Sequence, residues 1–215
     1  MPAAWKTISR QPASCSITER EDVRMTKVTI VSGFLGAGKT TLIKKLVQDN
    51  RSSSRKILLL NEFGEYAVDS TFMKEHNLFI EGLSGGCICC AGSGDFGRTV
   101  EEIVQWTAPG HIYIEPSGSV MLSAVVNSLL NSGVKENLEM QQVITVVDTK
   151  KFNCYLKNFG EFYRNQIEFA DVIVLNKAEG LSDEQLEECR SEIQTVNPAC
   201  TIRNMDADEC YQHVS

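Results

Sequence analysis

A phosphate-binding loop is encoded by residues 33–40, GFLGAGKT, which match the pattern G-x-x-x-x-G-K-[ST] between an apolar run and an amphipathic stretch. Glycines let backbone N–H groups converge on phosphate oxygens, and the start of the following helix adds a partial positive charge. We expect Lys39 to reach the β- and γ-phosphates, Thr40 to ligate Mg²⁺ and Thr41 to reach the α-phosphate. The backbone groups expected at the phosphates are those of Gly33, Gly36, Ala37 and Gly38. A glycine-rich turn without a ligand is the alternative, and the order of strand, loop and helix disfavours it.

A second motif, Asn176-Lys177-Ala178-Glu179, follows the apolar run 172–175, where P-loop GTPases carry a guanine-reading Asn-Lys-x-Asp sequence. An acidic side chain in the fourth position accepts hydrogen bonds from guanine N1–H and the 2-amino group, which adenine does not present together. Here the acid is Glu179, whose extra methylene changes the reach of the acceptor, so guanine selectivity is expected to be looser. The alternative is a polar loop that simply follows a strand.

Three of the eight cysteines, Cys87, Cys89 and Cys90, form a C-x-C-C motif. Thiolates at this spacing can turn toward one ion when the backbone bends, and soft sulfur ligands suit Zn²⁺, Cu⁺ or iron–sulfur chemistry. A tetrahedral site needs a fourth ligand, for which Glu62, His111, a water or a client protein are candidates. We favour zinc over the two alternatives, a redox-active thiol cluster and buried packing. The remaining cysteines are expected to be small apolar fillers or idle surface thiols: Cys15, Cys154, Cys189, Cys200 and Cys210.

The elements that must position these residues alternate along the chain. Continuous apolar runs predict buried strands at 28–32, 57–60, 78–83, 112–115, 143–147 and 172–175. Helices are predicted at 41–48, 96–106, 119–130, 150–158 and 183–195, the last opening with a capping box at Ser182 and Gln185. Core packing or a homodimer contact explains the apolar residues of 161–170. The alternation predicts an α/β fold with a doubly wound, mostly parallel sheet, as in P-loop NTPases.

Two acidic residues end predicted strands. Glu115 ends the fourth strand, where a Walker-B-like acid acts on Mg²⁺ through water, and residues 116–118 (PSG) then bend the chain back toward the nucleotide. Asp148 also ends a strand, and capping of the next helix is the alternative explanation for an acidic residue there. A carboxylate at the carboxyl end of a strand in such a sheet is more often functional than decorative.

Composition limits the remaining possibilities. A chain of 215 residues is long enough for one well-buried domain, and its net charge of −7 argues against nucleic acid or an anionic membrane as the main partner. No apolar stretch is long enough to cross a membrane, and the N-terminus lacks the apolar core of a secretory signal. We therefore expect a cytoplasmic protein with a disordered leader or over-long start at 1–24, one domain at 25–205 and a tail at 206–215.

Five motifs together resemble the CobW-type metal-insertion GTPases, relatives of the GTPases that insert nickel into urease and hydrogenase. In chain order they are VTIVSGFLGAGKTTLIKKL from Val28, NEFGE at 61–65, GGCICC at 85–90, IEPSG at 114–118 and NKAE at 176–179. The resemblance implies a slow GTPase that uses GTP and Mg²⁺, binds Zn²⁺ (Co²⁺ or Ni²⁺ being the other candidates) and serves a client metalloprotein or a cofactor-assembly protein. Many family members continue into a smaller C-terminal domain with a histidine-rich stretch, whereas this sequence stops at Ser215 and has three histidines.

By the same resemblance, catalysis would rest on Lys39, Glu62 and Glu115. Glu62 follows the second strand, where switch loops lie, and would respond to the Mg²⁺–γ-phosphate region or to the metal. Glu65, in the same loop, could equally be an exposed acid. Lys39 and Mg²⁺ would stabilise charge that develops on the phosphates, while a switch carboxylate orients the attacking water.

Two rival functions share parts of this pattern. An ATP-dependent small-molecule kinase would use the same loop and sheet, but leaves the NKAE motif and the cysteines unexplained. A metal-binding module with nucleotide as a structural ligand would bind zinc without ever releasing phosphate. Competition between nucleotides separates the first rival from a GTPase, and an assay of phosphate release separates the second.

Overall fold

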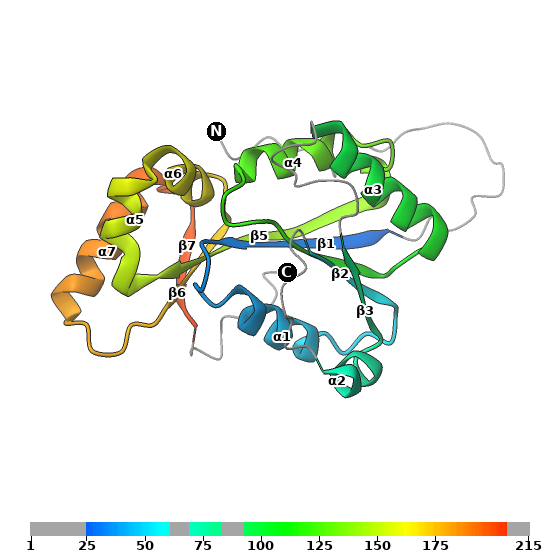
Figure 1. Cartoon of the computed structure of the whole chain (residues 1–215), viewed down its shortest axis with the longest axis horizontal. Helices are drawn as coiled ribbons and strands as arrows, with labels where there is room; N and C mark the ends of the chain where they lie inside the picture. Colours follow the sequence, from blue (N-terminus) through cyan, green and yellow to red (C-terminus); the bar gives the residue numbers. More distant parts are fainter. Residues whose placement is uncertain (1–24, 61–68, 83–92, 206–215) are drawn as a thin grey trace.

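Seven parallel strands form one central sheet in the computed structural model (Figure 1), which describes residues 25–60, 69–82 and 93–205. The strands are β1 (Thr26–Gly33), β2 (Lys56–Leu60), β3 (Leu78–Gly82), β4 (His111–Glu115), β5 (Leu138–Asp148), β6 (Val172–Asn176) and β7 (Thr201–Asn204). Their order in the sheet is β3-β2-β4-β1-β5-β6-β7, and every neighbouring pair is parallel. The strand that precedes the phosphate loop therefore lies centrally, between β4 and β5.

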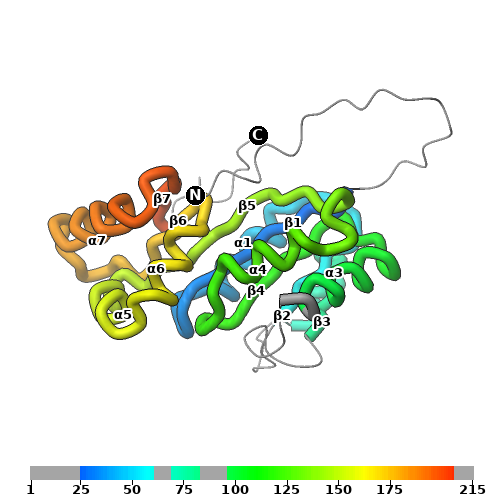
Figure 2. The backbone as a smooth tube through the Cα atoms, turned by 90° about the horizontal axis from the view of Figure 1, so that it is seen from above, coloured from blue at the N-terminus to red at the C-terminus, as the bar shows by residue number. Residues whose placement is uncertain are grey.

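Helices cover both faces of this sheet, which confirms the predicted doubly wound α/β fold. They are α1 (Lys39–Asp49), α2 (Ser70–Glu75), α3 (Ser93–Thr107), α4 (Leu122–Leu130), α5 (Phe152–Asn158), α6 (Gly160–Glu168) and α7 (Asp183–Val196), with short 3₁₀ turns η1 (Lys135–Asn137) and η2 (Thr149–Lys151). Figure 2 shows α5, α6 and α7 grouped at the β6–β7 end of the sheet and α3 at the β2–β3 end. Parallel strands require such crossovers, because each chain must return to the same edge before the next strand starts.

Alternate residues of the strands divide the core between the two faces. The buried side of α1 packs on one face, in a cluster that includes Leu42, Ile43, Leu46, Val47, Val31, Leu58, Ile144 and Val146. The other face carries α3 and α4, in a cluster that includes Val28, Ile30, Ile57, Leu59, Val100, Ile112, Val125 and Leu129. A third cluster joins α5, α6 and α7 to β5 and β6, and includes Val147, Phe152, Tyr163, Ile167, Ile173, Leu175 and Ile193. Strands buried on both faces need continuous apolar runs, which is why the sequence predicts them well.

Short polar elements are where prediction and structure differ. No apolar pattern in the sequence predicts α2, which has six residues, or β7, whose sequence TIRN has no buried residue at this sheet edge. The predicted helix 150–158 is a 3₁₀ turn followed by α5, and the predicted helix 119–130 begins only at Leu122. The capping box is confirmed: Gln185 N–H donates to Ser182 Oγ, and Ser182 N–H donates to the Gln185 side chain.

His111, one of the candidates for a fourth metal ligand, is a buried core residue whose contacts give it a structural role. It opens β4, at the amino edge of the sheet, whereas the C-x-C-C motif follows the carboxyl end of β3. Its Nε2 lies 2.9 Å from Thr29 Oγ1, its Nδ1 lies 3.2 Å from Asn50 Nδ2, and its ring stacks on Tyr113 at 4.2 Å. His111 is only 3% exposed, and both of its ring nitrogens have hydrogen-bond partners, as buried polar groups require.

Several predicted features fall outside the described residues. These are the leader 1–24, the tail 206–215, the loop residues Glu62 and Glu65, and the three cysteines of the C-x-C-C motif. Within the described ranges, none of the helices has the length and apolar character that a membrane crossing requires.

Candidate functional site

The predicted site residues meet at the carboxyl edge of the sheet. Gly33, Glu115, Asp148 and Asn176 are the last residues of β1, β4, β5 and β6. Because all these strands are parallel, their carboxyl ends lie at one edge, and Asp148 stands directly opposite Asn176 in the sheet register. The phosphate loop and the later polar motif therefore lie at the same edge of the sheet.

The phosphate loop requires glycine at its two ends. Gly33 has φ +140°, and a Cβ there would lie 2.5 Å from the Val146 carbonyl oxygen of the neighbouring strand. Gly38 has φ +109° and precedes α1 as its N-cap, a conformation that costs other residues free energy. Between them, Ala37 N–H donates to the Phe34 carbonyl at 3.1 Å. The loop thus turns tightly into the start of α1, whose first N–H groups have no partner within the helix.

Lys39 is held inside this loop next to Glu115. The lysine is 8% exposed, and its Nζ lies 3.4 Å from the Phe34 carbonyl oxygen and 3.6 Å from Glu115 Oε1. The structure thus brings together two of the three predicted catalytic residues. Thr40, the second residue of α1, is half-buried, and Thr41 is exposed. A buried ammonium next to a carboxylate suits a site for a phosphate and its metal ion. Lys39 can turn toward the phosphate, while Glu115 can face the metal ion.

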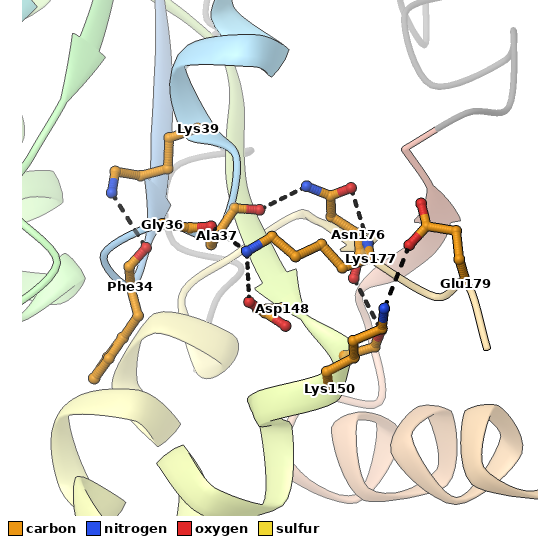
Figure 3. A network of polar contacts seen from close by, with 10 residues as sticks. Phe34, Gly36, Ala37, Lys39, Asp148, Lys150, Asn176, Lys177 and Glu179 are labelled. Atoms are coloured by element: carbon orange, nitrogen blue, oxygen red, sulfur yellow. Dashed lines mark hydrogen bonds and ion pairs between the residues drawn. The ribbon is translucent and has the colours of Figure 1, made fainter. Parts of the chain in front are cut away.

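Asn176 and Lys177 hold the phosphate loop from the opposite side (Figure 3). Asn176 Nδ2 donates to the Ala37 carbonyl at 2.7 Å, and Lys177 Nζ donates to the Gly36 carbonyl at 2.6 Å. The same ammonium donates to Asp148 Oδ2 at 2.8 Å. Lys177 has φ +60°, a left-handed conformation that costs a lysine about 1 kcal/mol or more. These three contacts compensate for that strain, and they fix the second motif against the first.

Asp148 holds Lys177, a role that the sequence alone does not predict. Asp148 is the N-cap residue of η2, but its carboxylate makes no cap hydrogen bond to that turn, so the capping alternative does not account for this side chain. It is 2% exposed and pairs with Lys177, while its Oδ1 is buried without a hydrogen-bond partner among the described residues. The signal available in the sequence was that Asp148 directly follows an apolar run, as Asn176 does. The structure shows that these two runs, in β5 and β6, are neighbours in the sheet. An acid at a strand end is ambiguous in sequence, because the same residue type also caps helices.

Glu179 differs from Asn176 and Lys177 in that, within the described part of the chain, its carboxylate has only a long, exposed ion pair. The side chain is 74% exposed, and its nearest cation is Lys150, with Nζ 3.9 Å from Oε2 and a side chain that is 50% exposed. Exposed ion pairs of this length contribute little, so the carboxylate is free to turn toward a base. Figure 3 shows Glu179 and Lys150 together at the rim of the network.

Metal-binding groups are sparse in the described part of the chain. Residues 25–60, 69–82 and 93–205 contain no group of three or more His, Cys, Asp or Glu side chains that could hold an ion. Burial raises the pKa of the Cys189 thiol to about 12 and also raises that of Cys200, so both stay protonated at neutral pH. Protonated thiols are poor metal ligands, which agrees with the expectation that these two cysteines are apolar fillers or idle thiols.

Residues 27–204 match the family model described as CobW/HypB/UreG, nucleotide-binding domain. The chain belongs to the CobW/HypB/UreG family. The match covers the phosphate loop, Glu115, Asp148 and the NKAE motif in one domain. The resemblance inferred from the five motifs is therefore confirmed.

Individual relatives agree with this assignment. A Sinorhizobium protein named zinc chaperone CobW is 29% identical over 83% of this chain and 58% of its own length. The zinc-regulated GTPase metalloprotein activator 1 of Schizosaccharomyces pombe is 31% identical over 79% of this chain and 43% of its own. The chain thus spans about half the length of these relatives. Among solved structures, the Zn(II)-bound YjiA GTPase of Escherichia coli shares the fold with a TM-score of 0.62 at 20% identity, over 83% of this chain and 57% of that one.

Proposed function

We propose that this chain is the GTP-binding and GTP-hydrolysing domain of a metallochaperone that couples its nucleotide state to the transfer of zinc. The observation that carries the nucleotide part is the attachment of Asn176 and Lys177 to the carbonyls of Ala37 and Gly36. This contact joins a guanine-reading motif to a phosphate loop, so one ligand with a base and phosphates can span both. A small-molecule kinase has no need of that arrangement.

Hydrolysis would proceed by positioning and electrostatics. A water attacks the γ-phosphorus, the bond between that phosphorus and the bridging oxygen of the β-phosphate breaks, and GDP and phosphate are released. Lys39 would stabilise charge on the β- and γ-phosphates, Thr40 would ligate Mg²⁺, and Glu115 would act on Mg²⁺ through water; the pairing of Lys39 with Glu115 and the position of Thr40 in the first turn of α1 support these roles. Bound Mg²⁺ would neutralise charge on the phosphate oxygens. Glu62, outside the described residues, is proposed to orient the attacking water.

Zinc is the proposed cargo, bound by Cys87, Cys89 and Cys90. Support comes from the thiolate chemistry of the motif and from the names of the relatives, which include zinc chaperones and a zinc-regulated GTPase. Three thiolates leave one tetrahedral position for a further ligand, such as Glu62 or a group of the client metalloprotein. An incomplete site suits a protein that transfers its metal, and Co²⁺ or Ni²⁺ would compete for it.

Guanine should be preferred over adenine, and Glu179→Asp should increase that preference. The parent side chain is exposed and one methylene longer than the usual aspartate, so it makes a less constrained pair of hydrogen bonds to the base. We expect the dissociation constant of ATP, divided by that of GTP, to rise about threefold or more in the variant. A change of this size is a fraction of the free energy of one charge-assisted hydrogen bond. Competition of GTP and ATP against a fluorescent guanine nucleotide measures this ratio.

Glu179→Ala is the matched control, because it removes the acceptor and should bring GTP and ATP toward equal affinity. If ATP outcompetes GTP in the parent protein, the kinase alternative replaces the proposed GTPase.

Zinc affinity should differ between the GTP and GDP states, and this is the decisive test of the coupling. The loop that contains Glu62 follows β2 and the cysteines follow β3, so both leave the sheet at the edge where the phosphate loop lies. We expect the zinc dissociation constants with a non-hydrolysable GTP analogue and with GDP to differ by about 5- to 150-fold. Linkage then requires zinc to change the GTP/GDP preference by the same factor.

Competitive titration of zinc against a chromophoric chelator, in both nucleotide states, measures the difference. Equal zinc affinities would contradict coupled transfer even if both ligands bind. Zinc binding with no phosphate release in the presence of any partner would favour the non-hydrolysing module.

A further inference from the structure

The ring of Phe34, the second residue of the phosphate loop, is the hub of an aromatic cluster on α5 and α6. Its centroid lies 4.9 Å from Tyr155, 5.2 Å from Phe159 and 5.0 Å from Tyr163, and the last two contacts are edge-on. The next residue, Leu35, is 81% exposed. The two apolar side chains of the loop therefore differ: only the ring of Phe34 is anchored, by helices that follow it by more than a hundred residues.

The backbone of the same residue receives Lys39. The Phe34 carbonyl accepts hydrogen bonds from Ala37 N–H at 3.1 Å and from Lys39 Nζ at 3.4 Å. One residue thus connects the aromatic cluster, through its ring, with the turn of the loop and the phosphate-reaching lysine, through its carbonyl. Aromatic contacts of this geometry contribute about 0.5–1.5 kcal/mol each beyond the area that they bury. Phe34 makes three such contacts, which tie this loop residue to α5, to α6 and to Phe159 between them.

A second contact from α6 supports the same segment. Gln166 is fully buried, and its Nε2 donates to the Gly118 carbonyl at 2.8 Å. Gly118 packs against the loop so closely that a Cβ there would lie 3.1 Å from both the Gly33 oxygen and the Phe34 Cα. The loop after Glu115 is thereby clamped between α6 and the backbone at Phe34. Helix α6 consequently contacts the phosphate loop directly through Tyr163 and indirectly through Gln166.

We propose that Phe34 is a positioning residue for nucleotide binding, through which α5 and α6 set the place of the carbonyl that receives Lys39. The inference rests on the proposed function in that its ligand is a guanine nucleotide. Loss of the ring leaves the other residues of the loop unchanged but lets the carbonyl of residue 34 move, and Lys39 with it. In enzyme sites, misplacement of a group by about 1 Å can lower the reaction rate as much as a hundredfold. We expect nucleotide binding to weaken for the same reason when Lys39 is displaced.

The test compares Phe34→Leu with Phe169→Leu. Both phenylalanines are half-buried, and Phe169 directly follows α6 but packs in the α3–α4 cluster, away from the loop. With the full chain and a fluorescent GDP, we expect Phe34→Leu to raise the dissociation constant about tenfold and Phe169→Leu to leave it within about twofold. Phe34→Tyr, which keeps the ring, should restore affinity to within about threefold of the parent. Tyr155→Leu, on the helix side of the cluster, should change affinity in the same direction as Phe34→Leu.

A second readout needs no nucleotide. Amide hydrogen exchange of a peptide covering residues 34–41 should be faster in Phe34→Leu than in Phe169→Leu in the nucleotide-free protein, because the anchored ring limits opening of the loop. Equal exchange and equal GDP affinity in the two variants would overturn the inference. A parent protein that binds no guanine nucleotide would instead overturn the proposed function, and the exchange comparison would still decide the role of Phe34.

Discussion

Replacing Lys39 with alanine should weaken GTP binding by at least about 100-fold, because it removes the cation proposed to bind the β- and γ-phosphates. Charge-assisted hydrogen bonds of this kind contribute about 1.5–3 kcal/mol each, and Lys39 can make more than one. The side chain is poised in the loop, with Nζ 3.4 Å from the Phe34 carbonyl oxygen and 3.6 Å from Glu115 Oε1. Isothermal titration with GTP and Mg²⁺, and the rate of phosphate release, should both show the loss.

Stability must be followed in the same experiment. Lys39 is in none of the three hydrophobic clusters, so the fold should persist, although loss of the cation beside the buried Glu115 will lower the melting temperature. Titrations are therefore made well below the lower of the two melting temperatures. Lys44→Ala, on the same helix but beyond the loop, is the control and should bind GTP like the parent. A Lys39→Ala protein with parental affinity would show that residues 33–40 do not bind phosphate.

Changing Cys87, Cys89 and Cys90 together to serine should weaken zinc binding by at least about 1000-fold. Thiolates supply most of the binding free energy of structural zinc sites, about 10–16 kcal/mol at neutral pH, and serine hydroxyls do not replace them. GTP binding, measured without zinc, should stay within about threefold of the parent, because the phosphate loop and the Asn176–Ala37 contact are untouched. Zinc titration against a chelator and GTP titration on the same preparations measure both effects.

Cys154→Ser is the matched control, since Cys154 is an exposed thiol on α5 outside the motif. It should bind zinc like the parent. Unchanged zinc affinity in the triple variant would place the metal elsewhere and remove the motif from the mechanism. Loss of both zinc and GTP binding would indicate that the cysteines support the fold of the nucleotide site instead of the metal alone.

Sequence predicted the parts of this molecule that depend on local pattern. The central strands are continuous apolar runs because both of their faces are covered, and the phosphate loop is contiguous in the chain. It also placed Lys39 and Glu115 at one edge, since parallel strands bring their carboxyl ends together. The polar elements α2 and β7 were missed because neither is long enough or apolar enough to show a period.

The roles that were missed depend on distant partners. Asp148 reads equally well as a helix cap until the structure shows Lys177 Nζ 2.8 Å away. Phe34 reads as an unremarked loop residue, and only the packing of α5 and α6 reveals three rings around it. His111 was a candidate metal ligand by residue type, and only the structure shows that both of its ring nitrogens lie within hydrogen-bond distance of Thr29 and Asn50. The partners of these three residues are set by which strands and helices lie side by side, and the local pattern of one sequence does not reveal that arrangement.

The bonds from Asn176 to Ala37 and from Lys177 to Gly36 join residues 139 and 141 positions apart. During synthesis the loop leaves the ribosome first, and the groups that hold its carbonyls emerge only after more than half of the chain has followed. A nascent chain that ends at α4 carries the phosphate-loop sequence but lacks β5 and β6, and with them Asp148 and both motif residues. Such long-range contacts form late and slowly in folding. We therefore expect nucleotide affinity in this domain to require folding through β6, and a product truncated before β6 to lack the stabilisation that a bound nucleotide would give.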